Sequence, residues 1–245
     1  MFENFVTCVA SNSQSRLGTF LDSFTKTINL EDLFLVIVDT IPNSENKLIV
    51  PEEYEENLRY FVFQSNKTTN ERLNYADIMR TKILASSPFC DEDTIYWNAD
   101  DDYAFNPYWY LVAKEIFTNH KEVTYVSLLK EFNTETYTPE SLSGFGFIRT
   151  KSCMGGTFGV RWETFEPIVM EYFKIYGINN MFDQEYWKFL SSKTNNLYNI
   201  YMLESFSLIQ HCNLVSNYLN TKTNKTDHMY GLGFDPNCNP FNLVT

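Results

Sequence analysis

Three consecutive carboxylates, Asp100-Asp101-Asp102, are the residues of this sequence best suited to chemistry. They follow an apolar segment, Thr94 to Trp97, that we expect to form a buried strand. Like charges at this spacing repel one another unless a cation lies among them. Carboxylate oxygens suit Mg²⁺ or Mn²⁺, which take few protein ligands and share phosphate oxygens with a substrate. The run therefore predicts a Mn²⁺ or Mg²⁺ site, with a plain acidic turn as the alternative.

Two further polar groups also follow apolar segments. Ser11-Asn12 and Arg16 come after the first apolar run of the chain, and Asp39 closes the second run, Leu33 to Val38. In an open parallel sheet, ligands bind beyond the carboxyl ends of the strands. We therefore expect these side chains and the carboxylate run to line one ligand site.

The spacing of apolar residues predicts the elements that position these groups. Continuous apolar runs predict buried strands, and recurrence every three or four residues predicts helices. We expect strands over residues 5–9, 33–38, 60–63, 94–97, 123–129, 144–149, 157–161 and 206–211. We expect helices over 17–24, from a capping box at Thr68 and Glu71 to Pro88, from Asn106-Pro107 to Ile116, and over 165–176 and 183–190. This alternation predicts an α/β fold, an open mixed sheet flanked by helices.

Length and composition limit the class of protein. The 245 residues, at about 150 residues per domain, are enough for one large core. Apolar residues make up 44% and aromatic residues 17% of the chain, which excludes a disordered protein. The 19 Lys and Arg against 31 Asp and Glu give a net charge of −12, which argues against nucleic acid as a partner.

Three features that the sequence does not show bear on the cellular compartment of the protein. No apolar run approaches the ~20 residues that a membrane-spanning helix requires. Residues 1–9 show no basic segment followed by a long apolar stretch, so no secretory signal is recognisable. The five cysteines form no C-x-x-C pair, which predicts free thiols. We expect a cytoplasmic protein without a transmembrane segment.

An ordered set of motifs resembles the GT-A-fold glycosyltransferases, the nucleotide-sugar-dependent enzymes of the family-2-like, DxD type. The matching segments are VASNSQSRLGTFLDSF, FLVIVD, NADDDY with the DxD-like run, MGGTFGVRWETFE, FDQEYWKFL and SLIQH. They span residues 5–212 in the order that the family shows. Asn98 stands where many relatives have an acidic residue, and three consecutive Asp leave the register of the DxD pair open by one position.

The resemblance implies roles for individual positions. Asp183 would be the catalytic base, and Asp102 and His211 would hold the metal together with the donor's diphosphate. Asp101 could take the role of either neighbour. The residues that would bind the nucleotide sugar are Ser11, Asn12 and Asp39 in the nucleoside pocket, Asp100 at the ribose or sugar, and Gly155 and Gly156 where the backbone approaches the sugar.

Arg16 and Arg80 are further candidates for the nucleotide-sugar site, because a guanidinium can cradle a diphosphate. Each has an ordinary alternative: Arg80 could pair with Asp77, and Arg16 could be surface charge. His211 could be a hydrogen-bonded core histidine, and Asp183 could cap the helix that it begins. Gly155-Gly156 could form only a turn, and Trp162 is expected in the core rather than stacked on a sugar.

The resemblance also implies a domain organisation. One GT-A domain would cover residues 1–216, with a nucleotide-binding half over about 1–105 and an acceptor half over about 106–216. The polar residues 217–245 would form a C-terminal loop or tail. There, Lys222, Lys225 or His228 could close over the donor phosphates.

The implied reaction moves a sugar from a nucleoside-diphosphate sugar, a UDP- or GDP-sugar first, to an acceptor hydroxyl, a glycan first. The divalent ion would act as a Lewis acid, and a general base would take the acceptor's proton, with inversion at the anomeric carbon. Two other functions stay open. A nucleotidyltransferase would also hold Mg²⁺ with carboxylates, and a non-catalytic nucleotide- or sugar-binding module could share the fold.

Overall fold

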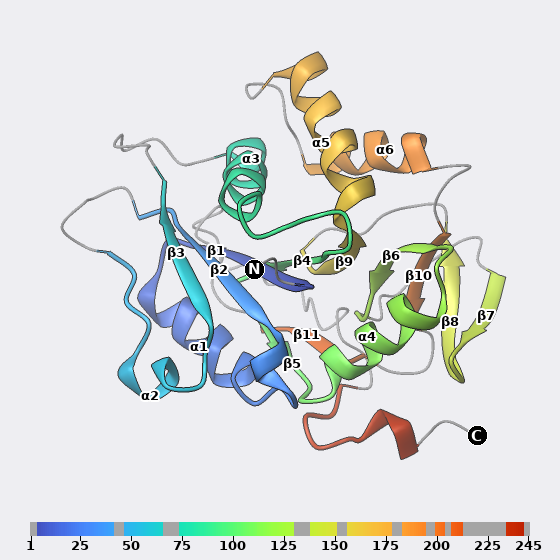
Figure 1. Ribbon diagram of the computed structural model, residues 1–245, viewed down its shortest axis with the longest axis horizontal. Coiled ribbons are helices and arrows are strands. Elements are labelled where there is room, and N and C mark those ends of the chain that lie inside the picture. The colour runs from blue at the N-terminus through green and yellow to red at the C-terminus, as the bar shows by residue number, and fades with distance from the viewer. Residues whose placement is uncertain are drawn as a thin grey trace, which may run out of the picture.

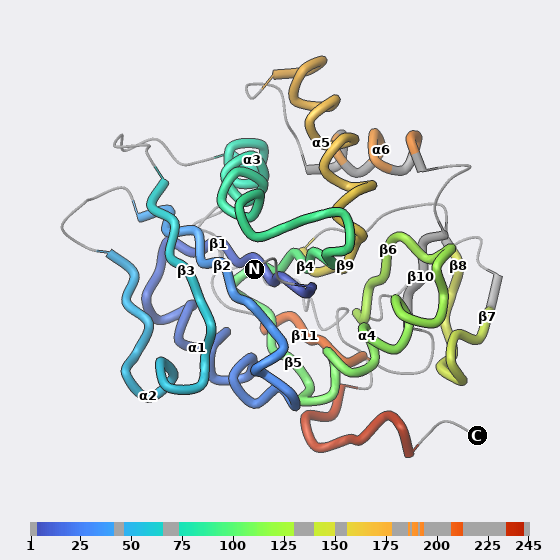
Figure 2. The backbone as a smooth tube through the Cα atoms, viewed as in Figure 1, coloured from blue at the N-terminus to red at the C-terminus, as the bar shows by residue number. Residues whose placement is uncertain are grey.

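Nine strands line up in one sheet in the part of the chain that the structure describes, and helices cover both faces (Figure 1). The computed structural model describes residues 4–41, 47–65, 74–129, 138–150, 156–177, 183–194, 199–203, 207–212 and 234–242. The strand order is β3-β2-β1-β4-β9-β6-β10-β8-β7. Figure 2 shows that the N-terminal strands lie at one end of this sheet and that β7 and β8 lie at the other.

The sheet is built from strands of four to seven residues. Their bounds are β1 (Phe5–Ser11), β2 (Phe34–Asp39), β3 (Tyr60–Gln64), β4 (Ile95–Asp100), β6 (Val123–Ser127), β7 (Thr138–Leu142), β8 (Phe145–Thr150), β9 (Phe158–Arg161) and β10 (Asn199–Leu203). β1 pairs in parallel with both β2 and β4, and β2 pairs in parallel with β3. β9 is antiparallel to β4 and β6, so the sheet is mixed, as predicted.

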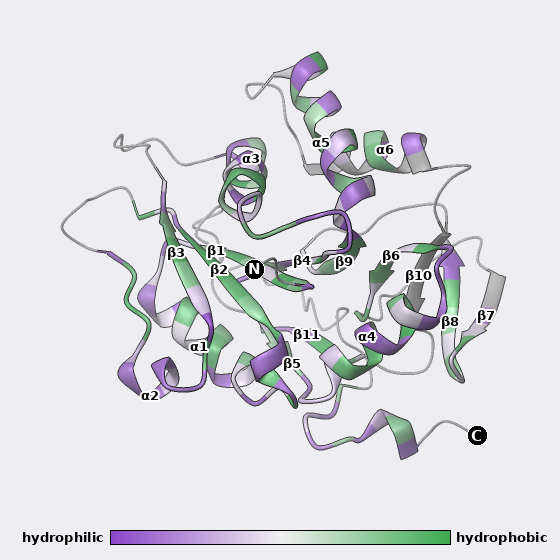
Figure 3. Ribbon diagram, in the orientation of Figure 1, coloured by the Kyte–Doolittle hydropathy of each residue, from purple (hydrophilic) through white to green (hydrophobic). Residues whose placement is uncertain are grey.

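The helices divide between the two faces of the sheet. They are α1 (Gln14–Phe24), α2 (Glu52–Glu55), α3 (Tyr75–Ser86), α4 (Trp109–Asn119), α5 (Trp162–Tyr176) and α6 (Asp183–Thr194). In Figure 1, α1 and α4 lie below the sheet, and α3, α5 and α6 lie above it. Figure 3 shows the apolar strands enclosed between these layers, with the acidic helix α2 outside them.

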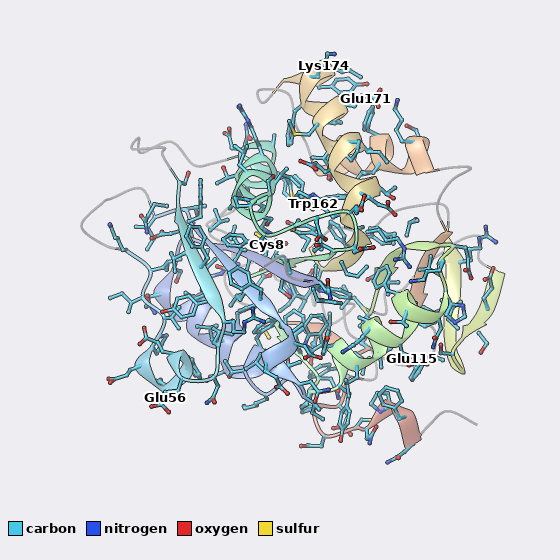
Figure 4. The ribbon with its side chains drawn as sticks, viewed as in Figure 1. Cys8, Glu56, Glu115, Trp162, Glu171 and Lys174 are labelled. Atoms are coloured by element: carbon cyan, nitrogen blue, oxygen red, sulfur yellow. The ribbon has the colours of Figure 1, made fainter. Side chains whose placement is uncertain are left out.

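Alternation along the strands builds a core on each face, because successive side chains point to opposite sides. Phe5 and Val9 of β1 pack with residues of α1 and α4, whereas Val6 and Cys8 pack with residues of α3 and α5. Burial on both faces explains why the central strands are continuously apolar in sequence. Trp162 lies at the foot of α5 (Figure 4) and is buried in the second core, as predicted.

A second, two-stranded sheet completes the fold beside the first. β5 (Tyr103–Phe105) pairs antiparallel with β11 (Ile209–His211), with His211 opposite Tyr103. β5 begins three residues after β4 ends, and β11 comes from near the end of the chain. This pairing brings a late segment of the sequence to the end of β4.

Several elements differ from the sequence prediction, and neither α2 nor β5 was expected. β7 lies in a stretch expected to be loop, and β10 follows an Asn-rich segment that showed no strand pattern. α3 begins at Tyr75 because the Asn74 side chain accepts a hydrogen bond from the backbone N–H of Asp77; the expected capping box at Thr68 and Glu71 lies outside the described residues. α4 begins at Trp109, two residues later than Pro107, where the sequence predicted its start.

Asn106 ties the last described segment to the core. Its Oδ1 accepts from the N–H of Tyr108, and its Nδ2 donates to the carbonyls of Asp235 (2.7 Å) and Cys238 (3.0 Å). The ring of Phe241 packs edge-on against Phe145, with 5.4 Å between the centroids. Part of the region expected to be a tail, residues 234–242, therefore packs against the body of the protein.

Two expectations concern the chain as a whole. None of the helices in the described residues combines the length and the apolar character needed to cross a membrane. The cysteines that the structure describes, Cys8, Cys90, Cys212 and Cys238, are free thiols, as predicted.

Candidate functional site

The strand register gathers the predicted site residues at one edge of the sheet. Ser11, the last residue of β1, stands opposite Asp39, the last residue of β2. On its other side β1 places Ala10 opposite Asp100, the last residue of β4. Three polar groups far apart in sequence thus end neighbouring parallel strands, as the sequence predicted.

Asp101 is held by two of the predicted residues. The Ser11 hydroxyl donates to its Oδ2 at 2.5 Å, and an Arg16 guanidinium nitrogen lies 2.5 Å from its Oδ1. Burial raises the pKa of Asp101, against the opposing effects of the Arg16 charge and the Ser11 hydrogen bond. The surface-charge alternative for Arg16 is wrong, because its side chain is largely buried and paired.

Asp102 meets the late histidine. Its Oδ2 lies 3.3 Å from Nε2 of His211 and 3.0 Å from a guanidinium nitrogen of Arg16, and the Cys212 N–H donates to its carbonyl at 2.6 Å. Burial raises the pKa of Asp102, but the hydrogen bond and charge of His211 and the charge of Arg16 outweigh it, so the pKa lies below its ordinary value. The pairing of β5 with β11 sets this contact in place.

Asp100 meets a buried lysine that the sequence analysis did not single out. Nζ of Lys82 donates to Oδ1 of Asn98 (3.0 Å) and to the carbonyl of Ala99 (2.7 Å), and it lies 3.4 Å from Oδ1 of Asp100. Enclosure by protein raises the pKa of Asp100 to about 6, with contributions from Asp101 and Asp102, and Lys82 opposes the rise. The Asp100 side chain is 38% exposed, so solvent screens part of this effect.

Lys82 could have been found from helix periodicity. It lies three residues after the buried Met79 and directly before the buried Ile83, so it falls on the inward face of α3. A lysine on such a face must meet an acceptor inside the protein, because an unpaired buried charge is very costly.

Asp39 orders the segment that follows β2. Its Oδ1 accepts from the N–H of Ile41, and its Oδ2 accepts from the N–H of Leu48 and from the side-chain amide of Gln64. The carboxylate therefore shapes the rim of the site beside Ser11. Its contact with a nucleoside stays a prediction.

Gly156 has a structural reason to be glycine. Its φ of +86° lies in the left-handed region, and a Cβ there would overlap the Tyr103 hydroxyl. Its carbonyl accepts from Nδ2 of Asn98 at 2.9 Å. Gly156 thus lies against both β4 and β5, and Gly155 lies outside the described residues.

Other predicted residues are only partly placed. Asn12 leads from β1 towards α1, and Arg80 lies on the exposed side of α3, on a different face from Lys82. Asp183 is the first residue of α6, and both its role as a base and its role as a helix cap stay predictions. Lys222, Lys225 and His228 lie outside the described residues.

The charges in this cluster partly offset one another. Arg16 and Lys82 supply positive charge beside the three carboxylates, so the repulsion expected from the sequence is relieved by side chains of the protein itself. Among the described residues, no three His, Cys, Asp or Glu side chains converge as metal ligands. Asp102 and His211 offer two, a set that fits Mn²⁺ or Mg²⁺ when a substrate diphosphate supplies the rest.

Comparison with known proteins supports the fold. No protein-family model and no curated protein matches the sequence. Among solved structures, residues 1–349 of TarS from S. aureus match 84% of this chain at 15% identity, with a TM-score of 0.57. TarS in complex with UDP-GlcNAc matches the same share at 15% identity, with a TM-score of 0.53. The mannosyltransferase from Pyrobaculum calidifontis, in complex with GDP-Man and Mn²⁺, matches 68% of this chain and 47% of its own length at 13% identity, with a TM-score of 0.43.

The matched part is a fraction of the larger proteins. The chain spans 59% and 57% of the two TarS chains. The identity is too low to transfer an activity, so the likeness concerns the fold alone. At that level the prediction is confirmed: the chain has an α/β fold of the GT-A type, an open mixed sheet flanked by helices.

Proposed function

We propose that this protein transfers a sugar from a nucleoside-diphosphate sugar to an acceptor hydroxyl. The observation that carries the proposal is the approach of Asp102 to His211, 3.3 Å apart although they come from distant parts of the sequence. Asp102 follows the carboxyl end of the parallel strand β4, the region where α/β proteins of this type bind nucleotides, and β11 brings His211 to it. TarS, whose fold the chain shares, has been crystallised with UDP-GlcNAc, which supports a nucleotide sugar as donor.

Different residues would bind different parts of the nucleotide-sugar donor. Ser11 and Asp39, at the ends of β1 and β2, would bind the nucleoside, and Asp100 would face the ribose or the sugar. Asp102 and His211 would hold Mn²⁺ or Mg²⁺. When bound, that ion supplies a Lewis acid that offsets charge on the departing diphosphate.

The acceptor side rests on Asp183 and the glycine turn. Asp183 would take the acceptor's proton as the acceptor oxygen bonds to the anomeric carbon and the bond from that carbon to the diphosphate breaks. Attack on the face opposite the diphosphate inverts the carbon, and the base contributes typically ~10²–10⁴ in rate. The turn at Gly156 would line this side of the site with backbone, and Tyr103 takes the space where a Cβ of residue 156 would lie. A UDP- or GDP-sugar as donor and a glycan as acceptor are the first choices to test.

A thermal-shift screen of nucleotide sugars, each with and without Mn²⁺, tests the donor part. A ligand at 100 times its Kd stabilises the folded state by ~2.7 kcal/mol, which moves the melting temperature measurably. We expect one UDP- or GDP-sugar to raise it, more so with Mn²⁺. If no nucleotide sugar does so under either condition, the proposal is wrong.

A non-catalytic nucleotide-binding module is the second candidate. The bridge that Arg16 makes between Asp101 and Asp102 favours it, because the carboxylates are then partly balanced without an added ion. Turnover separates the two candidates. If the donor binds but neither hydrolysis nor transfer of its sugar is detected, and Asp183→Ala changes nothing, the binding module is the better description.

A further inference from the structure

Lys82 is fully buried, which is rare for a lysine. α3 carries it on its inward face between apolar neighbours and delivers its ammonium to the end of β4. A charge in such a place must be balanced by nearby acceptors. Each of those acceptors belongs to one of the last three residues of β4.

An ammonium group has three N–H donors, and here it has three oxygen atoms within reach. The Asn98 side chain lies at 3.0 Å, the Ala99 carbonyl at 2.7 Å and the Asp100 carboxylate at 3.4 Å. Lys82 therefore fixes a backbone carbonyl and two side chains at the point where β4 runs into the carboxylate cluster. Removing it would leave all three without that donor.

Asn98 extends this arrangement to the other side of the site. Its Oδ1 accepts from Lys82, while its Nδ2 donates to the carbonyl of Gly156 at 2.9 Å. A carboxylate at this position could accept from Lys82 but could not donate to Gly156. The double contact therefore gives a physical reason for asparagine where many relatives of the resembled family carry an acidic residue.

We propose that Lys82 is a positioning residue of the nucleotide-sugar site. The Lys82 ammonium contacts Asp100, which we place at the donor, and it also contacts Asn98. Asn98 in turn holds the turn at Gly156, which we place at the acceptor. The inference rests on the proposed function, because donor and acceptor must meet between those two elements. A purely structural lysine would stabilise the core without favouring one part of the ligand over another.

The test compares two ligands that reach different parts of the site. A nucleoside monophosphate should depend mainly on the nucleoside pocket at Ser11 and Asp39, and the sugar of a nucleotide sugar also reaches the space between Asp100 and the Gly156 turn. The variant is Lys82→Met, which keeps most of the side-chain volume and removes the donors. Lys114→Met is the matched control, because Lys114 contacts Asp32 on the exposed side of α4.

Calorimetry below the melting temperature of each protein should separate the two ligands. We expect Lys82→Met to weaken binding of the nucleotide sugar at least ~10-fold, which is ~1.4 kcal/mol, and binding of the monophosphate less than ~2-fold. Lys114→Met should change neither. Equal weakening of both ligands, or no change in either, would overturn the proposal. If Lys82→Met does not fold, Lys82→Gln keeps an N–H donor without the charge and serves in its place.

Hydrogen exchange gives a second measurement that needs no ligand. In Lys82→Met, amides near residues 98–100 and amides near 156–159 should both exchange faster than in wild type. The reason is that the contact between Lys82 and Asn98 stabilises both segments. In Asn98→Asp, only the segment near 156–159 should do so, since Lys82 keeps an acceptor there. Faster exchange confined to α3 would contradict the proposal. If wild type binds no nucleotide at all, the proposed function fails and this measurement still decides whether Lys82 couples the two segments.

Discussion

At Asp102 a single carboxylate oxygen, Oδ2, lies within reach of an imidazole nitrogen and a guanidinium nitrogen. The imidazole of His211 can become a metal ligand when neutral, but the guanidinium of Arg16 cannot. The two side chains therefore have opposite relations to a divalent ion, which gives two predictions of opposite sign.

Removing a proposed ligand should weaken metal binding. We expect Asp102→Asn and His211→Ala each to lower the affinity for Mn²⁺ at least ~10-fold, or ~1.4 kcal/mol, as measured by electron paramagnetic resonance of the free ion. His120→Ala is the control, because His120 lies beside Ser143 and Glu122. Unchanged affinity in both variants would remove Asp102 and His211 from the metal site.

Removing Arg16 should strengthen metal binding. Its guanidinium shares Oδ2 of Asp102 with the proposed ion, so Arg16→Gln should raise Mn²⁺ affinity in the absence of nucleotide by roughly fivefold or more. Arg149→Gln removes the same charge from an exposed pair with Glu140 and should change little. Weaker Mn²⁺ binding by Arg16→Gln would show that Arg16 organises the carboxylates rather than competing for them.

The raised pKa of Asp100 predicts a pH-dependent stability. The folded pKa of about 6 exceeds the ordinary value of 3.8, so the protonated form favours folding at low pH and this advantage is lost as pH rises through about 6. We expect Asp100→Asn to stabilise the protein at pH 8 by about 1 kcal/mol, discounted for the exposure of the side chain, and to have no such effect at pH 4. Thermal unfolding at both pH values measures it, with Asp93→Asn as an exposed control. A gain of equal size at both pH values would contradict the assignment.

At the scale of elements, β9 pairs with β4 at Gly159, opposite Trp97, where no side chain can be added. A Cβ at Gly159 would overlap the ring of Trp97 and press on Phe117. We expect Gly159→Ala to lower the free energy of unfolding by about 1–3 kcal/mol, measured by urea denaturation. Gly18→Ala is the matched control: a Cβ there meets nothing within 4 Å, and alanine should stabilise α1 by ~0.5–1 kcal/mol. A neutral Gly159→Ala would mean that β4 and β9 can move apart.

The central elements could be predicted because each buries a long run of apolar residues. β1, β2 and β4 lie between two helix layers. Because both of their faces are buried, their sequences are continuous apolar runs. β5 is three residues long, too short for periodicity to reveal, and its partner β11 is remote in sequence. The β5–β11 pairing is a tertiary event that no local pattern encodes.

The site was predictable in part for the same reason. The sequence predicted that Ser11, Asp39 and Asp100 lie together, because each ends an apolar strand. The resemblance to a known family predicted that Asp102 and His211 lie together. The contacts of Lys82 with the last residues of β4 depend on how α3 packs over the sheet, which sequence alone does not fix. The same holds for the position of Arg16 between two carboxylates.

At the scale of the whole molecule, Asn106 joins the beginning of α4 to the last described segment. We expect Asn106→Ala to release residues 234–242, because the carbonyls of Asp235 and Cys238 lose their donor, at a cost of about 1–3 kcal/mol. Limited proteolysis followed by mass spectrometry should show faster cleavage there. Asn119→Ala, at the exposed end of α4, is the control. Cleavage at the wild-type rate would show that the packing of Phe241 on Phe145 is sufficient.

In the sequence, one proposed metal ligand, Asp102, comes before the turn between β7 and β8, and the other, His211, comes after it. Ser143 and Gly144 adopt positive φ in this turn. A polypeptide cut at this turn would leave Asp102 on one fragment and His211 on the other. Neither fragment alone would contain the pair, so recovery of Mn²⁺ affinity on mixing them would report reassembly of the native interface. The small sheet of β5 and β11 thus offers a direct readout for fragment complementation.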